Sequence, residues 1–279
     1  MRVQVDDTRL FFDIVGDELV PCGPGLRERP TMVCLHGGPG ADHSELKHYL
    51  APLSDVARLV FVDQRGQGRS DPSTPERWNL DRWIDDVRRF CDAIEIVRPT
   101  ILGHSFGGVV ALGAAIRHPD LAGRLVISSS NARFRLDRVL AKMEELGGAK
   151  ARTVAKCFFA EPGHETFEAF SDTCVPLYSA VTLDADVAAR IRRRPEVAFH
   201  FFRSADFAYD LSRDLGAIRC PTLILGGRLD PIATVEDQLE LHAGIPGSRL
   251  ELVHAAGHGV FRDRPDEALA LLRDFVEGG

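Results

Sequence analysis

The sequence predicts an α/β protein built on a mostly parallel eight-stranded sheet with helices on both faces. Short runs rich in Val, Ile and Leu alternate with helical patterns along most of the chain, and unbroken apolar runs are typical of strands buried on both faces. The alternation stops once, over residues 131–217, where the pattern is helical and aromatic-rich without a buried strand. We therefore expect a core domain of residues 1–130 and 218–279, and a helical cap of residues 131–217 inserted after the sixth strand.

The expected strands are short and are separated by turns or helical segments. They cover residues 2–5, 10–15, 32–35, 58–62, 100–102, 124–128, 222–225 and 249–253. The expected helices cover residues 44–53, 80–96, 106–117, 235–243 and 265–276. In the second of these, recurring apolar residues form one stripe: Trp83, Val87, Phe90, Cys91 and Ile94. The first two strands have no helix between them, so an antiparallel hairpin is expected to begin the sheet.

Composition and charge exclude several classes of protein. Hydrophobic residues make up 44% and charged residues 27% of the chain, which excludes disordered, collagen-like and disulfide-scaffold proteins. The net charge of −7 disfavours a nucleic-acid partner and an anionic membrane surface.

Targeting signals and cysteine usage predict the compartment. No run approaches the roughly 18 apolar residues of a membrane span, and the N-terminal residues lack the basic start and apolar stretch of a signal peptide. The six cysteines are scattered without the spacing of metal ligands, so we expect free thiols. These features predict a cytoplasmic protein that is a monomer or small homo-oligomer and does not bind membranes.

The segment Gly103-His104-Ser105-Phe106-Gly107 lies between an expected strand and an expected helix. In a strand-to-helix turn, the pattern G-x-S-x-G holds the serine in a strained conformation with its hydroxyl exposed above the sheet. The flanking glycines are required because the turn is too tight for a Cβ. Surface turns also match this pattern, but the strand before it and the helix after it favour a nucleophile, which is Ser105.

A serine nucleophile needs a histidine base and an acid that orients this base, and in this kind of sheet the chain order is serine, acid, histidine. Asp230 lies just past the strand over 222–225, and His258 lies just past the strand over 249–253. They are therefore the predicted acid and base. The less favoured acids are Asp63, Asp206 and Asp210, and the less favoured bases are His104, His242 and His254. Of these we expect Asp63 in a structural loop and His104 in a structural or pocket-lining position.

Stabilising the oxyanion of an acyl-transfer reaction requires N–H donors. The segment His36-Gly37-Gly38-Pro39-Gly40 follows the strand over 32–35, where such a loop supplies one backbone N–H, and the residue after the nucleophile supplies the other. We predict the Gly38 and Phe106 N–H groups as the donors, with Gly37 as the alternative to Gly38.

Five segments resemble α/β-hydrolases with a cap and, within that fold, the proline iminopeptidase family of serine peptidases. They are HGGPG at 36–40, DQRGQGRS at 63–70, GHSFGG at 103–108, GRLDP at 227–231 and GHGVFRDRP at 257–265. Together they span nearly all of the chain outside the expected cap. The resemblance implies an α/β-hydrolase fold, a serine mechanism and activity on substrates with a free amino terminus.

Two positions depart from the iminopeptidase pattern. That family usually has tryptophan after the nucleophile, where this chain has Phe106. It also tends to carry a cap motif E-x-H-Y-F, whose glutamate helps to hold the free amino terminus of the substrate. The corresponding segment here begins with Ala198. Other acids could take over this role: Glu161, Asp172, Glu196 or Asp206.

The aromatic residues of the expected cap predict an apolar substrate pocket. We expect its lining to include His36, His104, Tyr178, Phe199 and Phe202. These features predict a serine hydrolase that cleaves an amide, ester or lactone bond of a small apolar substrate through an acyl-enzyme, without a metal or other cofactor. The alternatives are a carbon–carbon bond hydrolase or a cofactor-free haloperoxidase with the same triad, and a non-catalytic ligand receptor.

Overall fold

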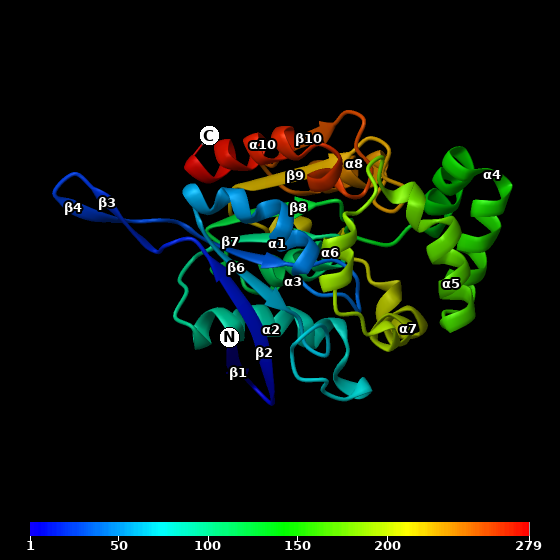
Figure 1. The fold of residues 1–279 in the computed structure, drawn as a ribbon, viewed down its shortest axis with the longest axis horizontal. Helices are drawn as coiled ribbons and strands as arrows, with labels where there is room; N and C mark the ends of the chain where they lie inside the picture. Colours follow the sequence, from blue (N-terminus) through cyan, green and yellow to red (C-terminus); the bar gives the residue numbers. More distant parts are fainter. Residues whose placement is uncertain (279) are drawn as a thin grey trace.

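The computed structural model describes residues 1–278, and an eight-stranded sheet forms its centre (Figure 1). In spatial order the strands are β1 (Arg2–Val5), β2 (Thr8–Val15), β6 (Arg58–Asp63), β5 (Thr31–Leu35), β7 (Thr100–His104), β8 (Arg124–Ser128), β9 (Thr222–Gly227) and β10 (Arg249–Val253). β1 pairs antiparallel with β2, and β2 with β6, while the other neighbours are parallel. The predicted sheet is confirmed, including the antiparallel hairpin at its beginning.

Helices cover both faces of this sheet. One face carries α2 (Leu80–Ala93), α3 (Phe106–Arg117) and α8 (Val235–Gly244), and the other carries α1 (Ser44–Leu50), α9 (Val260–Asp263) and α10 (Pro265–Glu277). Figure 1 shows α1 crossing in front of the strands, α10 at the top of the view beside β10, and α2 toward the bottom near β1 and β2. Along β5, Val33 and Leu35 belong to the first core, whereas Met32 and Cys34 belong to the second. Because both faces are buried, the parallel strands are apolar throughout, which is why the sequence predicts them.

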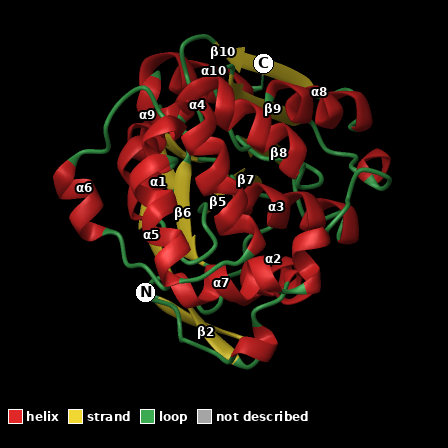
Figure 2. Cartoon of the chain, turned by 90° about the vertical axis from the view of Figure 1, so that its right-hand side faces the viewer, coloured by secondary structure: helices red, strands yellow, loops and turns green. Residues whose placement is uncertain are grey.

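Between β8 and β9 the chain is helical. It forms α4 (Leu136–Ala160), α5 (His164–Thr173), α6 (Ala185–Arg190) and α7 (Pro195–Arg203), with 3-10 turns over Val175–Tyr178, Ala205–Ala208 and Leu215–Ala217. Figure 2 shows α4, α5 and α7 in front of the sheet. Their inner side chains form a separate apolar cluster that includes Phe158 and Phe170. The helical character of this segment agrees with the sequence, and the division into core and cap domains stays a prediction.

The structure also contains a two-stranded hairpin that the sequence analysis does not predict. β3 (Leu19–Cys22) and β4 (Gly25–Glu28) pair antiparallel and project from the left of the molecule in Figure 1. Nearly all of their residues are exposed, so the alternation of buried and exposed positions that marks a strand is missing.

Smaller differences concern the ends of helices. The helix expected over 80–96 ends at Ala93, and the one expected over 44–53 divides into α1 and a 3-10 turn over Ala51–Asp55. A further 3-10 turn covers Pro75–Arg77. None of the helices within residues 1–278 has both the length and the apolar character needed to cross a membrane.

Candidate active site

Ser105 lies at the turn between β7 and α3. Its backbone has φ 54° and ψ −121°, a conformation that residues with a side chain rarely adopt. A Cβ at Gly103 would collide with the carbonyl oxygen of Gly107, and a Cβ at Gly107 would collide with that of Leu35. The strained turn therefore requires glycine at both flanking positions, as the pattern G-x-S-x-G predicts.

Asp230 and His258 lie at the same edge of the sheet as Ser105. Asp230 follows β9, and His258 lies between β10 and α9. The Ser105 Oγ is 2.8 Å from His258 Nε2, and His258 Nδ1 is 2.9 Å from Asp230 Oδ2 and 3.0 Å from Oδ1. The predicted nucleophile, base and acid thus form one continuous chain of hydrogen bonds. Both Asp230 and His258 are buried.

Backbone hydrogen bonds hold the acid and the base in place. Asp230 Oδ1 accepts from the N–H groups of Ile232 at 2.8 Å and Ala233 at 3.0 Å. The His258 N–H donates to the Tyr178 carbonyl at 2.6 Å, and the Tyr178 ring lies edge-on to the imidazole with centroids 5.2 Å apart. Because a carboxylate only accepts, the His258 proton lies on Nδ1, which leaves Nε2 free to accept from the Ser105 hydroxyl.

The loop after β5 lies against Ser105. A Cβ at Gly37 would be 3.1 Å from the Ser105 Cβ, and Gly38 follows with φ 131°, where glycine is strongly favoured. Phe106 begins α3, and the first N–H groups of a helix have no carbonyl partner within it. Both predicted donors, and the alternative Gly37, therefore lie close to Ser105, while their contact with an oxyanion stays a prediction.

Ser105 and His258 line a cavity of about 630 Å³. Aromatic side chains make up much of its wall: Tyr49, Phe106, Phe134, Phe158, Phe159, Phe167, Phe170, Tyr178, Phe201, Phe202, Phe207, Tyr209 and Phe261. Four of the five predicted pocket residues line it, namely His36, His104, Tyr178 and Phe202. An apolar cavity over the nucleophile is therefore present where the aromatic-rich segment predicts one.

Phe199 is the fifth predicted pocket residue, and here the prediction is wrong. It packs against His164 and Phe167 of α5, with ring centroids 5.0 and 5.7 Å away, and does not line the cavity. Phe201, on the same helix, lines the cavity instead. Which rings of α7 face inward depends on its packing against α5, and the sequence does not determine that packing.

Two further histidines lie beside the cavity and are held neutral. Burial is the main cause that lowers the pKa of His104, to about 3, and the charge of Arg262 acts in the same direction. Burial also lowers the pKa of His36. Both nitrogens of the His36 ring form hydrogen bonds with the backbone. Nδ1 is 2.7 Å from the Gly37 carbonyl oxygen, and Nε2 accepts from the Gln64 N–H at 3.2 Å. Neither ring is placed to take the proton of Ser105.

The less favoured candidates for the acid and the base do not take part in the hydrogen-bonded chain of Ser105, His258 and Asp230. Asp63 is buried against His43, and Asp206 accepts from the N–H that begins α2. Asp210 Oδ1 accepts hydrogen bonds from the backbone N–H and the hydroxyl of Ser212. Apart from His104, the remaining candidates lie outside the cavity: Asp63, Asp206, Asp210, His242 and His254.

The carboxylates that line the cavity are already paired. The acids that the sequence offers for holding a substrate amine lie elsewhere: Glu161, Asp172, Glu196 and Asp206. Asp42 and Glu45 line the cavity instead. Asp42 forms an ion pair with Arg69 and accepts from the Arg192 N–H at 3.1 Å, and Glu45 pairs with Arg262 at 3.1 Å. Both negative charges are therefore compensated by the protein itself.

Within residues 1–278, no group of three or more His, Cys, Asp or Glu side chains is placed to hold a metal ion. The cysteines are free thiols, and burial raises the pKa of Cys91 to about 12 and that of Cys174 to about 11. Both thiols are therefore protonated at neutral pH, the form in which they are poor nucleophiles.

Comparison with known proteins gives the family. Residues 30–265 match the family model described as the alpha/beta hydrolase fold. The chain is 27% identical to the proline iminopeptidase of Saccharolobus solfataricus, over 88% of this chain and 84% of that one. It is 28% identical to the 2-hydroxy-6-oxo-6-phenylhexa-2,4-dienoate hydrolase of Comamonas testosteroni, over 89% and 88% of the two chains. The crystal structure of a proline iminopeptidase from Mycobacterium smegmatis matches with a TM-score of 0.80 at 20% identity, over 99% of this chain and 97% of that one. The resemblance seen in the sequence is confirmed, and the chain belongs to the α/β-hydrolase fold family.

Proposed function

We propose that this protein is a serine hydrolase that cleaves an ester, amide or lactone bond of a small apolar substrate through an acyl-enzyme. The observation that carries the proposal is the hydrogen-bonded chain from Ser105 through His258 to Asp230, beside a cavity walled by aromatic rings. The fold by itself hosts many chemistries, so the function is argued from this site. The named activities of the two curated relatives agree with hydrolysis and differ in substrate.

In the proposed reaction, His258 Nε2 takes the proton of Ser105 as the serine Oγ attacks the substrate carbonyl carbon. Asp230 keeps the imidazole proton on Nδ1 and stabilises the imidazolium that forms. The N–H groups of Gly38 and Phe106 stabilise the oxyanion of the tetrahedral intermediate. The imidazolium then donates its proton to the leaving oxygen or nitrogen, and the acyl group remains on Ser105. Water deprotonated by His258 releases the acid and restores the serine.

The wall of the cavity favours a neutral acyl group. An ammonium group bound among apolar side chains needs a carboxylate partner, because its desolvation is otherwise uncompensated. The two lining carboxylates, Asp42 and Glu45, are engaged by arginines. Ala198 lines the cavity where the iminopeptidase motif has glutamate. We therefore propose neutral esters and lactones with bulky apolar acyl groups as preferred substrates over peptides with a free amino terminus.

A covalent probe tests the nucleophile. A fluorophosphonate should label the wild-type protein on Ser105, and Ser105→Ala should escape labelling and lose roughly 10⁴-fold or more in kcat. Ser248→Ala is the matched control, since Ser248 lies outside the cavity and bonds to His242 at the surface. Full activity of Ser105→Ala would contradict the mechanism.

A substrate panel tests the acyl group. Short and long acyl esters, lactones, and prolyl and other aminoacyl arylamides are compared by kcat/KM with the same preparation. We expect the esters and lactones with apolar acyl groups to be turned over fastest. Turnover confined to the free-amine arylamides would contradict the preference for neutral substrates and leave the serine mechanism intact.

A further inference from the structure

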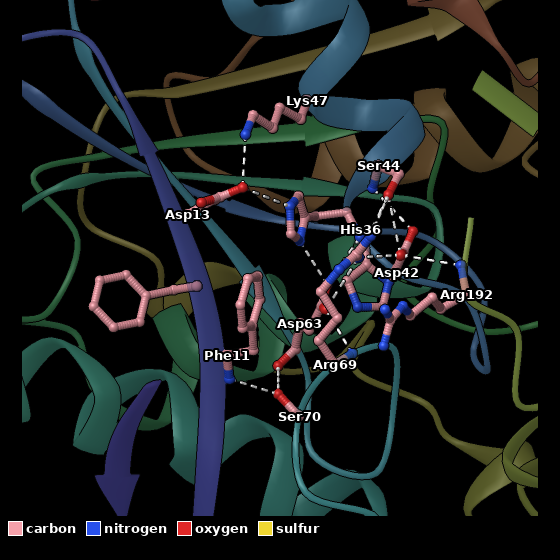
Figure 3. Close-up of polar contacts among 12 residues, drawn as sticks. Phe11, Asp13, His36, Asp42, Ser44, Lys47, Asp63, Arg69, Ser70 and Arg192 are labelled. Atoms are coloured by element: carbon pink, nitrogen blue, oxygen red, sulfur yellow. Dashed lines mark hydrogen bonds and ion pairs between the residues drawn. The ribbon is translucent and has the colours of Figure 1, made fainter. Parts of the chain in front are cut away.

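A buried carboxylate anchors the segment between β5 and α1, the glycine loop (residues 36–43), from outside the cavity (Figure 3). Asp63, at the end of β6, is fully buried and does not line the cavity. Its Oδ1 accepts from His43 Nδ1 at 2.6 Å and from the His43 backbone N–H at 3.0 Å, and its Oδ2 accepts from the Arg69 N–H at 2.8 Å. Burial alone would raise the pKa of Asp63, but the hydrogen bonds from the His43 side chain and the Arg69 backbone N–H help to hold this pKa below its usual value. The glycine loop thus ends on an ionised carboxylate.

The His43 side chain is enclosed on several sides. It is 3% exposed and lies between the rings of Phe11 and Phe61, with centroids 5.9 and 6.0 Å away. Its Nε2 faces Asp13 at 3.6 Å, and Asp13 is paired with Lys47 at 2.6 Å. The residue that ends the glycine loop is therefore held by two strands of the sheet, β2 and β6, as well as by its hydrogen bonds.

The rest of the glycine loop is held by the residues that follow Asp63, the anchor loop (residues 64–70). The Gly40 N–H donates to Gln67 Oε1 at 2.7 Å. At the start of the glycine loop, the Gln64 N–H donates to His36 Nε2 at 3.2 Å, and the Gln64 side chain donates to the His36 carbonyl at 2.9 Å. The anchor loop therefore contacts the glycine loop at its beginning and its middle.

The same two loops hold the segment that leads into α7. The Arg192 N–H donates to Asp42 at 3.1 Å, and the Arg194 N–H donates to the Gly40 carbonyl at 2.8 Å. Asp42 is in turn paired with Arg69 of the anchor loop. The glycine loop and the part of the cavity wall that α7 carries therefore share one set of anchors.

We propose that Asp63 and His43 are positioning residues, which hold the glycine loop so that the N–H at Gly38 or Gly37 meets the oxyanion. This inference rests on the proposed function. Three of the five residues 36–40 are glycine, so the local backbone has little preference for one conformation. Oxyanion donors act through their position, and a misplacement of about 1 Å can cost about 100-fold in rate. Neither positioning residue touches the reacting atoms, and both act through the backbone of the loop.

A pair of substitutions separates the hydrogen bond from the packing. His43→Phe keeps a ring between Phe11 and Phe61 and the backbone N–H that donates to Asp63, but it removes the side-chain donor. His43→Asn keeps a side-chain donor near the position of Nδ1 but removes the ring. We expect kcat for an ester to fall roughly 10- to 100-fold in His43→Phe, with KM changing less than about threefold. His43→Asn should retain more activity than His43→Phe. The reverse order would show that ring packing matters instead and would overturn the proposal.

A second readout reports on the oxyanion itself. A thionoester places sulfur, a weaker hydrogen-bond acceptor, where the ester has oxygen, so the ratio of kcat/KM for an ester to that for its thionoester measures the contribution of the donors. We expect this ratio to fall in His43→Phe. It should also fall in Gln67→Met, which removes the side-chain oxygen that accepts from the Gly40 N–H. It should be unchanged in Asp71→Asn, which removes a carboxylate paired only at the surface with Arg9.

The possible failures are distinguishable. Thermal unfolding of each variant shows whether it is folded, and Gln67→Met tests the same loop if His43→Phe is not. An unchanged ester-to-thionoester ratio in the folded variants would overturn the positioning role even if kcat fell. If the fluorophosphonate does not label the wild-type protein, the proposed function fails as well. If it does label the protein while the ratio stays unchanged, only the positioning role fails.

Discussion

Replacing Asp230 by asparagine should abolish most of the activity while leaving the fold in place. Two backbone N–H groups, from Ile232 and Ala233, point at Oδ1, so the amide oxygen of the variant must take that position. The amide NH₂ then takes the position of Oδ2, 2.9 Å from His258 Nδ1. An amide NH₂ only donates, so the histidine proton must move to Nε2. In that tautomer Nε2 can no longer accept a proton from Ser105.

The size of the effect follows from the tautomer. The variant must reach the active tautomer against a donor–donor contact, and it also loses the carboxylate that stabilises the imidazolium. Together these should lower kcat roughly 10⁴-fold, which is about 5.5 kcal/mol at about 1.4 kcal/mol per factor of ten. The free energy of unfolding should change little, because the amide oxygen still accepts from Ile232 and Ala233.

The assay is steady-state hydrolysis of the best ester from the substrate panel, with urea denaturation to measure stability. Asp230→Ala is the informative companion, because it leaves both N–H groups without an acceptor and should lose stability as well as activity. Asp71→Asn, at the surface, is the neutral control. Activity of Asp230→Asn within tenfold of the wild type would refute the assignment of Asp230 as the acid that orients His258.

Two further predictions concern the turn and its pH response. Gly107→Ala should lower the free energy of unfolding by roughly 2–3 kcal/mol, because its Cβ would collide with the Leu35 carbonyl, whereas Gly216→Ala meets nothing and should stay within about 0.5 kcal/mol. Equal stability of these two variants in urea would contradict this. Burial lowers the pKa of His104 from 6.5 to about 3. Between these two pH values His104 is therefore protonated in the unfolded chain and neutral in the folded chain. As the pH is lowered from about 6.5 to 3, the free energy of unfolding of the wild type should therefore decrease. This decrease should be steeper than in His104→Gln by up to about 1.4 kcal/mol per pH unit. If urea denaturation gave the same dependence of the free energy of unfolding on pH for both proteins, the prediction would be contradicted.

Much of the fold could be predicted because the informative patterns are local. β8, β10 and α3 have the residue bounds that the sequence predicts. In β8 and α3 the apolar runs that predict them are buried along nearly their whole length. The β3–β4 hairpin could not be predicted in this way. Nearly all of its side chains are exposed, so its sequence has no alternation of apolar and polar residues that would predict strands.

The candidate triad could also be predicted, because parallel strands end at one edge of their sheet. Ser105, Asp230 and His258 each follow such a strand, so their strands bring together residues that are up to 153 positions apart. The partner of Asp63 could not be found in this way. The motif at 63–70 marks the segment as resembling a family, but nothing in the residues around His43 indicates that its ring lies against that carboxylate.

The sequence by itself determined which segments form the parallel strands and the strained serine turn, because these depend on burial and steric limits within a few residues. It also located the triad, because each member directly follows one of those strands. Only the tertiary structure decided what fills the space above the serine. It turned Phe199 away from the cavity and Phe201 toward it, and it paired Asp42 and Glu45 with arginines. These choices depend on how separate helices and loops pack against one another. The energies of such contacts depend on residues that are distant in the chain, so a local residue pattern cannot predict them.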